Sequence, residues 1–307
     1  MIQLRSVRKT YKIGEVLTKA LDNIDLDIYP GEFLAIMGKS GSGKSTLLNQ
    51  IGLIDEPDSG DIIYNGKNIV ELDEETKNEF RLRNFGFVFQ DYILFPELTV
   101  IENVCLPAIA MGLSLDKSKT KALSILKILN MEHKVLNRPY QLSGGEKQRV
   151  AIARAIINNP LVVLCDEPTA NLDSKNSKEV LSYLREINIK FNKTVVMVTH
   201  DKEETKYADR VIYLEDGRII RTEIINRARF NIVLKKKNST FIQDKIENII
   251  RYFNLKNNLK KPNLQRLLYY YKSLCSLYDM LDIKEKKNYH RDILRVYSIL
   301  KKIRASK

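Results

Sequence analysis

A glycine-rich run near the start of the chain has the residue types and spacing of a phosphate-binding loop. It fits the pattern G-x-x-x-x-G-K-[ST], and we expect the run and the residue after it to contact a nucleotide: Gly38, Lys39, Ser40, Gly41, Ser42, Gly43, Lys44, Ser45 and Thr46. The glycines let backbone N–H groups face phosphate oxygens with no Cβ in the way. Lys44 would place a positive charge at the β- and γ-phosphates, and the Ser45 hydroxyl would bind Mg²⁺.

A second glycine-rich turn lies much further along the chain and opens a helix. The helical pattern runs from Val150 to Ile157 and stops at residues 158–160, and the turn before it contains Ser143, Gly144, Gly145 and Glu146. A serine and two glycines at a helix N-terminus offer free backbone N–H groups and a favourable dipole to an anion. One chain therefore carries two predicted phosphate sites.

Two carboxylates follow the apolar run 161–165. A carboxylate at the end of a buried parallel strand points into the crevice where such sheets bind ligands. Asp166 would hold Mg²⁺, and Glu167 would act as general base toward the attacking water. An acidic pair in this place is more often a helix cap, but residues 168–173 separate it from the next helical stretch.

Two further polar residues occupy equivalent positions after other apolar runs. Gln90 follows residues 87–89, and His200 follows residues 195–199. Taken alone, the first would be a surface glutamine in a turn and the second a structural histidine. Their place at the ends of predicted buried strands makes both candidates for the same crevice.

The arrangement of apolar residues predicts the elements that position these side chains. Alternation at 2–7 and 21–28 indicates two early strands, and short apolar runs at 33–37, 161–165 and 195–198 indicate buried strands. The last two are separated by a helical stretch at 174–190, which favours an α/β fold with a mostly parallel sheet covered on both faces. A turn at Asn65 and Gly66, a mostly helical middle and a terminal hairpin at 211–220 complete the prediction.

Composition limits the class of protein. The chain has 307 residues, 44% hydrophobic and 29% charged, which is typical of globular proteins with ample core. It contains no run of eighteen uncharged apolar residues and no signal-peptide core at its start. Cys105, Cys165 and Cys275 are far apart and odd in number, so we expect reduced thiols, mostly buried.

The net positive charge of the chain comes from its C-terminal part. Residues 231–307 carry 19 lysines and arginines against 6 acidic residues, which accounts for the whole net charge of +13. Apolar residues recur there at helical spacing in three stretches, 242–253, 264–278 and 289–300. We therefore predict two regions: a domain at 1–230, with a helical subdomain at about 91–160, and a basic helical extension at 231–307.

The order of the motifs resembles that of ABC-type ATPases over about residues 1–225. The resemblance implies a P-loop fold with an N-terminal antiparallel β subdomain and a helical signature subdomain. It also implies that residues 143–146, the signature motif, close over the γ-phosphate held by a second subunit. In the same way Gln90 would reach Mg²⁺ and the attacking water, and His200 would contact the γ-phosphate. Asp173 would bridge the subunits, and Tyr11, expected in an early loop, would stack on adenine. For Tyr11 the alternative is an ordinary tyrosine, one of 15 in the chain.

Residues 86–107 look most like the lipoprotein-releasing and macrolide-exporting branch of these ATPases, with the cell-division ATPase as a near relative. This likeness implies ATP and Mg²⁺ as cofactors, a homodimer formed on ATP binding, and separate membrane permease subunits that hold the protein at the cytoplasmic face of the cell membrane. Export or extraction of a lipoprotein, peptide or drug-like substrate is the leading expectation. Regulation of cell-wall enzymes through a membrane partner is the alternative. A DNA-repair or translation ATPase is disfavoured, since no long insertion or second cassette is present.

The extension has no counterpart in the short members of the family and leaves three interpretations open. It could be a helical module with a basic outer face. It could also contact anionic lipid, where each well-placed basic residue contributes about 1 kcal/mol. Nucleic-acid binding ranks third, because no fold signature accompanies the charge.

Overall fold

The computed structural model describes residues 1–231, 233–234 and 283–305. The chain divides into two compact units, Met1–Val233 and Leu234–Lys307. The first unit holds both glycine-rich turns and all the candidate site residues. Each unit is described by itself below.

An antiparallel sheet forms one edge of the first unit. Its strands are β1 (Ile2–Ile13), β2 (Val16–Ile28), β4 (Ser59–Tyr64) and β5 (Lys67–Asn68), in the order β2-β1-β4-β5. Between β4 and β5, Asn65 and Gly66 have φ values of 50° and 85°, which suit a two-residue hairpin turn. The predicted N-terminal antiparallel subdomain and its turn are confirmed.

A mostly parallel sheet forms the centre. Its order is β10-β9-β3-β8-β7-β6, and only β10 runs antiparallel to its neighbour. The strands are β3 (Phe33–Met37), β6 (Phe85–Val88), β7 (Val162–Asp166), β8 (Thr194–Thr199), β9 (Arg210–Glu215) and β10 (Arg218–Ile224). Apolar side chains on both faces explain why these strands read as unbroken apolar runs.

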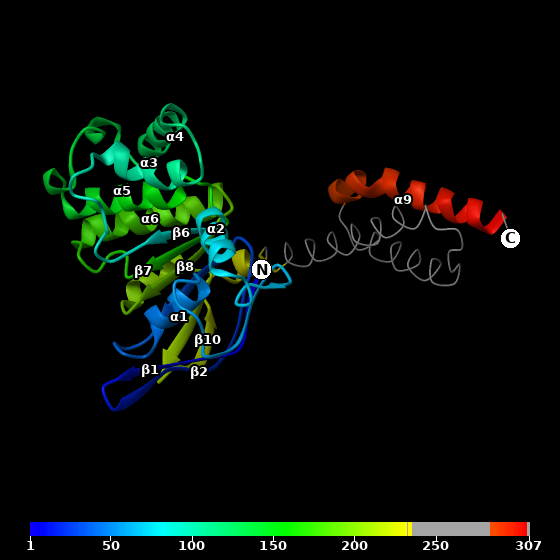
Figure 1. Ribbon diagram of the computed structural model, residues 1–307, viewed down its shortest axis with the longest axis horizontal. Helices are drawn as coiled ribbons and strands as arrows, with labels where there is room; N and C mark the ends of the chain where they lie inside the picture. The colour runs from blue at the N-terminus through cyan, green and yellow to red at the C-terminus, as the bar shows by residue number, and fades with distance from the viewer. Residues whose placement is uncertain (232, 235–282, 306–307) are drawn as a thin grey trace. The chain divides into compact units, whose positions relative to one another are not determined.

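Successive residues of the central strands belong to two different cores, as the pleat of a strand requires. One face packs on helix α1 (Lys44–Ile51) and the first sheet, through Leu34, Ile36, Leu164, Val196 and Val198. The other face packs on the helical layer, through Phe33, Ala35, Val163, Val195 and Met197. Figure 1 shows α1 between the two sheets and helices α3 to α6 on the far side of the central sheet.

The helical layer consists of α3 (Val100–Ala110), α4 (Leu115–Ile128), α5 (Gly144–Ile156) and α6 (Ser174–Lys190), with short 3₁₀ helices at Glu132–Lys134 and Pro139–Gln141. Another 3₁₀ helix, η3 (Lys202–Tyr207), follows β8. Helix α2 (Glu74–Asn84) was not predicted, because it has few apolar residues and buries only Lys77. Its N-terminus is fixed by Asp73, whose side chain accepts a hydrogen bond from Thr76.

The second unit is described through helix α9 (Ile283–Ala305), which confirms a helix in the third of the stretches expected there. Val296 of this helix is buried, whereas Tyr297 is 52% exposed. The stretches 242–253 and 264–278, and Cys275, lie outside the described residues. None of the helices in the described ranges is long and apolar enough to cross a membrane.

Candidate nucleotide-binding site

The phosphate-binding loop connects β3 to α1 and leaves the start of this helix open to a ligand. Gly43 precedes the helix with φ 99°, and no side chain caps the first turn. A Cβ on Gly43 would lie 2.2 Å from the carbonyl oxygen of Ala20, so the close approach of β2 requires glycine as much as the left-handed backbone does. The free N–H groups of the first turn therefore face the loop, as an anion site needs.

The polar side chains of the loop are oriented inward. Lys44 is buried, and its Nζ donates a hydrogen bond to the carbonyl oxygen of Lys39 at 2.9 Å, which curls the ammonium group over the loop. The Ser42 hydroxyl is also buried and has no hydrogen-bond partner among the described residues. A buried cation and an unpartnered hydroxyl in one loop fit a bound phosphate group.

The end of β7 supplies an oxygen pair beside this loop. The Ser45 hydroxyl donates to Oδ1 of Asp166 at 3.0 Å. Burial raises the pKa of the Asp166 carboxyl above its usual range, although the hydrogen bond from Ser45 opposes the rise. A hydroxyl and a partly buried carboxylate next to a phosphate site form a donor set that suits Mg²⁺, which takes a few protein oxygens and fills its other positions with phosphate and water.

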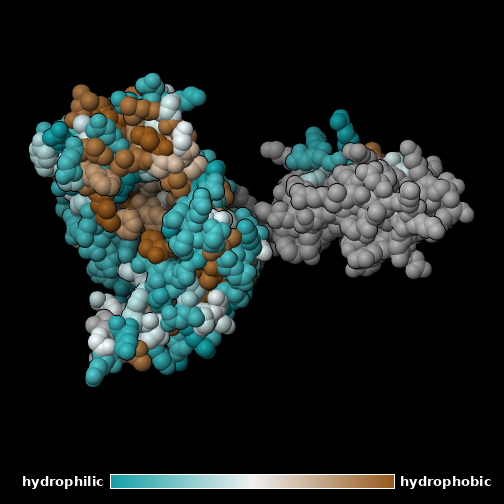
Figure 2. Space-filling model, in the orientation of Figure 1, coloured by the Kyte–Doolittle hydropathy of each residue, from teal (hydrophilic) through white to brown (hydrophobic). Residues whose placement is uncertain are grey.

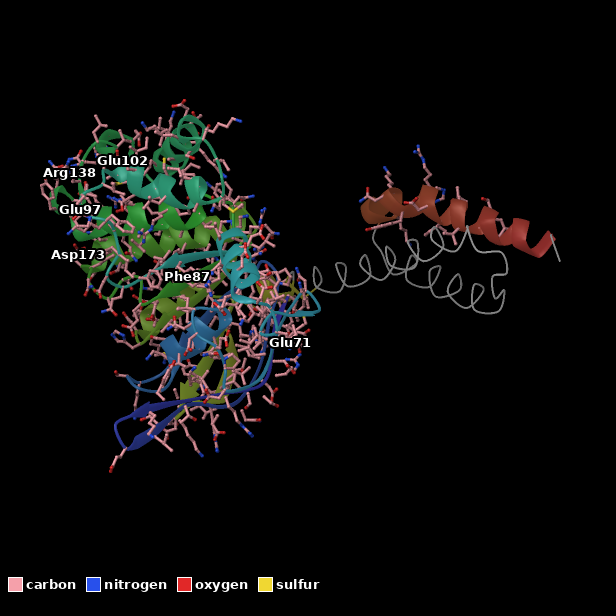
Figure 3. The ribbon with its side chains drawn as sticks, viewed as in Figure 1. Glu71, Phe87, Glu97, Glu102, Arg138 and Asp173 are labelled. Atoms are coloured by element: carbon pink, nitrogen blue, oxygen red, sulfur yellow. The ribbon has the colours of Figure 1, made fainter. Side chains whose placement is uncertain are left out.

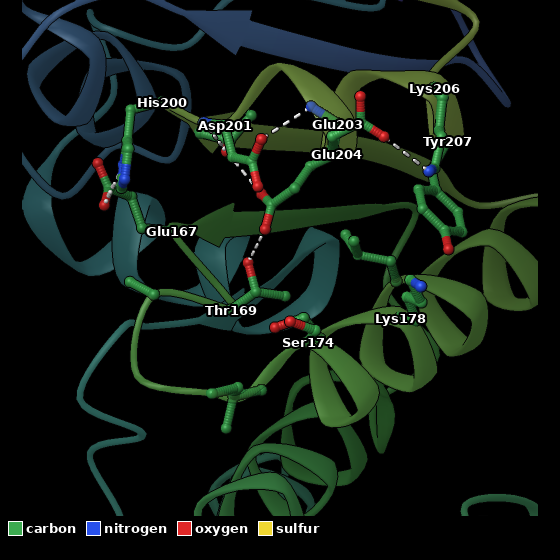
Figure 4. A pocket seen from close by; sticks show the side chains of 15 residues that line it. Glu167, Thr169, Ser174, Lys178, His200, Asp201, Glu203, Glu204, Lys206 and Tyr207 are labelled. Atoms are coloured by element: carbon green, nitrogen blue, oxygen red, sulfur yellow. Dashed lines mark hydrogen bonds and ion pairs between the residues drawn. The ribbon is translucent and has the colours of Figure 1, made fainter.

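Glu167 and His200 meet at the ends of neighbouring parallel strands. Nδ1 of His200 lies 3.0 Å from Oε2 of Glu167, as Figure 4 shows. The backbone of Glu167 is left-handed, with φ 42°, and its N–H donates to the carbonyl oxygen of Val198 at 3.1 Å. This turn directs the carboxylate toward the histidine. Both side chains remain partly accessible, with 21% of Glu167 and 63% of His200 exposed.

Gln90 lies two residues beyond β6, and the following backbone has an unusual conformation. Tyr92 and Ile93 have φ values of 62° and 48°, which is rare for any residue other than glycine and rarest for a β-branched one. The Arg154 guanidinium of α5 donates to both of their carbonyl oxygens, at 2.8 Å in the case of Tyr92. The segment after Gln90 is therefore held by α5, the helix that begins at the second glycine-rich turn.

Asn171 makes a second connection to this segment. Its side-chain amide donates to the carbonyl oxygen of Gln90 at 3.3 Å and to the Asp91 carboxylate at 3.4 Å. Sequence reasoning missed Asn171 and Arg154 as site residues. The only signal for Asn171 was its place in the run 168–173, and Arg154 reads as an ordinary helix residue.

The second glycine-rich turn is closed by its own side chains. Ser143 caps α5: its hydroxyl accepts from the N–H of Glu146 at 3.3 Å, and its own N–H donates to the Glu146 carboxylate at 2.8 Å. Glu146 thus completes the cap, and Lys134 lies 3.5 Å from it. In the described part of the chain, no hydrogen bond or ion pair joins residues 143–146 to residues 38–46.

Two residues assigned from the resemblance have local roles here. Tyr11 lies in β1 and not in a loop as expected, because the β1–β2 pairing extends to Ile13. Its hydroxyl donates to Asp55 at 2.6 Å, and partial burial together with this bond raises the pKa of Tyr11 to about 12. Asp173 caps α6 by accepting from the N–H groups of Lys175 and Asn176, both at 2.9 Å. Stacking on adenine and bridging between subunits stay predictions.

Comparison with known proteins identifies the family. A family model described as ABC transporter matches residues 21–170. The chain is 46% identical over 227 residues to the ATP-binding protein MJ0796 of Methanocaldococcus jannaschii, an ABC transporter protein, which covers 73% of this chain and 97% of the relative. The chain therefore belongs to the ATP-binding proteins of ABC transporters, and it is an ATPase of that family, as the motifs indicated.

Individual relatives place it more closely. It is 41% identical over 263 residues to the macrolide export ATP-binding/permease protein MacB of Haemophilus ducreyi, which covers 86% of this chain. The chain spans about a third of the length of such MacB relatives, 37% in this case. A solved dimer of MJ0796 bound to ADP and Pi superposes with a TM-score of 0.69 at 44% identity, over 73% of this chain and 99% of that one. The cbiO1 protein of Clostridium perfringens, part of the transporter complex cbiONQ, gives a TM-score of 0.66 at 31% identity over 77% of this chain and 93% of that one.

Proposed function

We propose that this chain powers separate membrane permease subunits by ATP-driven closure of a homodimer. The observation that carries the proposal is the placing of the two phosphate-binding turns. One adjoins the Ser45–Asp166 and Glu167–His200 pairs, and the other is capped on α5 with no hydrogen bond or ion pair to the first among the described residues. The MJ0796 relative is a dimer with ADP and Pi bound, which supports the same assembly for this chain.

Within one site, each side chain has a role that follows from its chemistry. Mg²⁺, when bound, would neutralise charge that develops on the phosphates. Ser45, Asp166 and the Gln90 side chain would supply the oxygen ligands. Lys44 would hold the β- and γ-phosphates, with the residues of the run 38–46 donating backbone N–H groups.

The hydrolytic step would use the Glu167–His200 pair. The Glu167 carboxylate would accept the proton of the attacking water as general base. His200 would orient that carboxylate through Nδ1 and would contact the γ-phosphate with the other side of its ring. Ser143, Gly144 and Gly145 of the partner subunit would close the site with a hydroxyl and backbone N–H groups, at the positive end of α5.

An apolar groove next to Gln90 is the proposed docking place for the permease. The groove has a volume of about 460 Å³ and is lined by Phe85, Phe87, Phe89, Ile93, Phe95 and Pro107. Figure 2 shows apolar side chains gathered in a hollow between the helical layer and α2, and Figure 3 marks Phe87 there. Ile93 and Phe95 are 54% and 52% exposed and lie together in this groove, and a contiguous exposed apolar patch marks an interaction site.

The MacB relatives support a permease as the occupant of this groove. Those proteins are named as both ATP-binding protein and permease, so their names join this kind of ATPase to a permease. We propose that a separate chain supplies the membrane part and holds this one at the cytoplasmic face of the membrane. Bending of the segment 89–95 would then couple the groove to the site, because Phe89 and Ile93 line the groove and Gln90 between them is a proposed Mg²⁺ ligand.

Export or extraction of a lipoprotein, peptide or drug-like substrate is the transport activity that we propose. The support is the identity of 41–46% to several proteins named for macrolide export. The alternative is regulation of cell-wall enzymes without transport. ATP-dependent transport in proteoliposomes that contain the native membrane subunit would support the first, whereas absent transport together with control of a wall hydrolase would establish the alternative.

The groove can be tested with a matched pair of substitutions. Phe95→Asp should abolish co-purification with the membrane subunit and ATP-dependent transport, while ATP hydrolysis by the isolated chain stays within about twofold of wild type. The backbone of Phe95 is held at both its N–H and carbonyl by the Asn103 side chain, so the loop should keep its shape. Leu17→Asp is the control, since Leu17 is 67% exposed on the N-terminal sheet. Equal loss in both variants, or none in Phe95→Asp, would reject the groove as the docking place.

We further propose that residues 231–307 form a basic helical module of their own that contacts anionic lipid. Helix α9 combines several lysines and arginines with an exposed leucine, Leu294, which is 55% accessible. Deleting 231–307 should reduce binding to vesicles rich in phosphatidylserine, and the binding lost should be that which salt screens. Unchanged vesicle binding after deletion would reject the lipid contact.

A further inference from the structure

We propose that Glu204 is a positioning residue for hydrolysis, because it ties the segment that carries Glu167 to the segment that carries His200. Glu204 lies on η3 and is only 8% exposed. It does not touch the nucleotide loop, and it would act through the two residues at the reacting end of the site. The inference rests on the proposed roles of Glu167 and His200.

Both oxygens of the Glu204 carboxylate are used. Oε1 accepts a hydrogen bond from the Thr169 hydroxyl, and Oε2 accepts one from the Thr199 hydroxyl at 2.5 Å. The N–H of Asp201 donates to the Thr199 hydroxyl at 3.0 Å, so the hydroxyl oxygen of Thr199 has two hydrogen-bond partners. Figure 4 shows the hydrogen bond between the Glu204 carboxylate and Thr169.

The positions of the two threonines give this network its significance. Thr169 follows Glu167 by two residues, and Thr199 directly precedes His200. A buried carboxylate that accepts from both hydroxyls therefore fixes the spacing of the two segments close to the Glu167–His200 contact. Hydrogen bonds to an ionised group are shorter and stronger than neutral ones, which makes this a firm connection.

The carboxylate bridge adds to the backbone pairing of the two segments. Strands β7 and β8 pair as far as Asp166 and Val198, and the N–H of Glu167 donates to the carbonyl oxygen of Val198 at 3.1 Å. Beyond these strand ends, Glu204 joins the two segments through its side chain. A cavity of about 500 Å³ opens beside the network, and its lining includes Glu167, Thr169, His200 and Glu204.

Glu203 offers a matched control one residue away. Its side chain is 82% exposed and pairs with Lys206 at 3.1 Å on the outer side of η3. Glu203→Ala therefore removes a carboxylate from the same short helix without touching either threonine. It should leave ATP hydrolysis within twofold of wild type.

The test is a double-mutant cycle on ATP hydrolysis by the full chain, with His200→Ala as the second substitution. Glu204→Ala should lower kcat about tenfold with little change in the KM for ATP, and it should cost no more than about twofold on the His200→Ala background. A tenfold further loss on that background would show independent effects and would overturn the proposal, as would an unchanged kcat in Glu204→Ala. If His200→Ala itself hydrolyses ATP like wild type, the proposed role of His200 fails instead.

Gentler substitutions guard against a loss of folding. Thr169→Val keeps the volume but removes one hydroxyl donor, and we expect a severalfold fall in kcat that Thr169→Ser reverses. Glu204→Gln keeps the shape and has one acceptor oxygen in place of two, so it should lie between wild type and Glu204→Ala. Equal rates for the valine and serine variants would contradict the proposal even if both fold normally.

Discussion

The two glycine-rich turns of this chain look alike in sequence but differ in how their helix N-termini are satisfied. At the first turn, Gly43 precedes α1 in a left-handed conformation and no side chain caps the helix. At the second, Ser143 and Glu146 cap α5 reciprocally. The first turn also has a buried lysine, Lys44, whereas Glu146 of the second turn is partly buried and pairs with Lys134 at 3.5 Å.

This difference indicates which turn can bind a phosphate alone. An uncapped helix start with an inward ammonium group needs an anion to satisfy its donors. A capped helix start has already satisfied one orphan N–H, so it retains a dipole, further N–H groups and a serine O–H but gains less from an anion. The second turn is better suited to complete a site in which another subunit already holds the phosphates.

The largest effect on hydrolysis is expected from a substitution at Glu167, beside the first turn. Glu167→Gln removes the base but keeps the side-chain shape, so hydrolysis should fall by about two orders of magnitude or more while ATP binding is retained. A closed dimer should accumulate with ATP, measured by size-exclusion chromatography with light scattering. Turnover like that of wild type would show that Glu167 is not the base.

Mixing two inactive chains tests whether the turns serve different subunits. Lys44→Ala should prevent ATP binding, and Ser143→Arg should leave it intact but block closure. A mixed dimer joins the Lys44 of the second variant to the Ser143 of the first and rebuilds one whole site. ATP hydrolysis by the mixture should exceed that of either variant alone by about tenfold.

The complementation experiment has an internal control in the double variant. A chain that carries both substitutions cannot rebuild a site with either single variant, and its mixtures should remain inactive. Recovery in those mixtures would mean that a site works without Lys44 or without Ser143. A failure of the two single variants to complement each other would contradict a site shared between two chains.

The smallest expected effect separates capping from phosphate binding at the second turn. Ser143→Ala and Thr99→Ala each remove the serine or threonine of a capping box, on α5 and α3 respectively. Each should lower the free energy of unfolding by about 1 kcal/mol, measured in urea. Only Ser143→Ala should also slow ATP hydrolysis; equal rates in the two variants would assign Ser143 a capping role alone.

The sequence was sufficient to predict the strands and the site residues that sit at their ends. Asp166, Glu167 and His200 follow runs whose length and unbroken apolar character identify buried strands, so their shared crevice follows from the topology of a parallel sheet. Helix α6 has the predicted bounds 174–190, although the cap that fixes its start, Asp173, was assigned only to a bridge between subunits.

Long-range polar contacts could not be predicted in the same way. Arg154 and Glu204 each bind a segment that is distant in the chain, and neither has a local pattern that indicates its partner. Tyr11 was placed in a loop because the register shifts of the β1–β2 ribbon conceal its length. Helix α2 was missed for want of an apolar stripe.

The central claim, that a complete site requires two chains, is tested most directly by the concentration dependence of ATP hydrolysis. The rate per chain should rise with protein concentration at saturating ATP and level off where light scattering shows a dimer. A constant and full rate per chain at concentrations where only monomer is present would contradict the account.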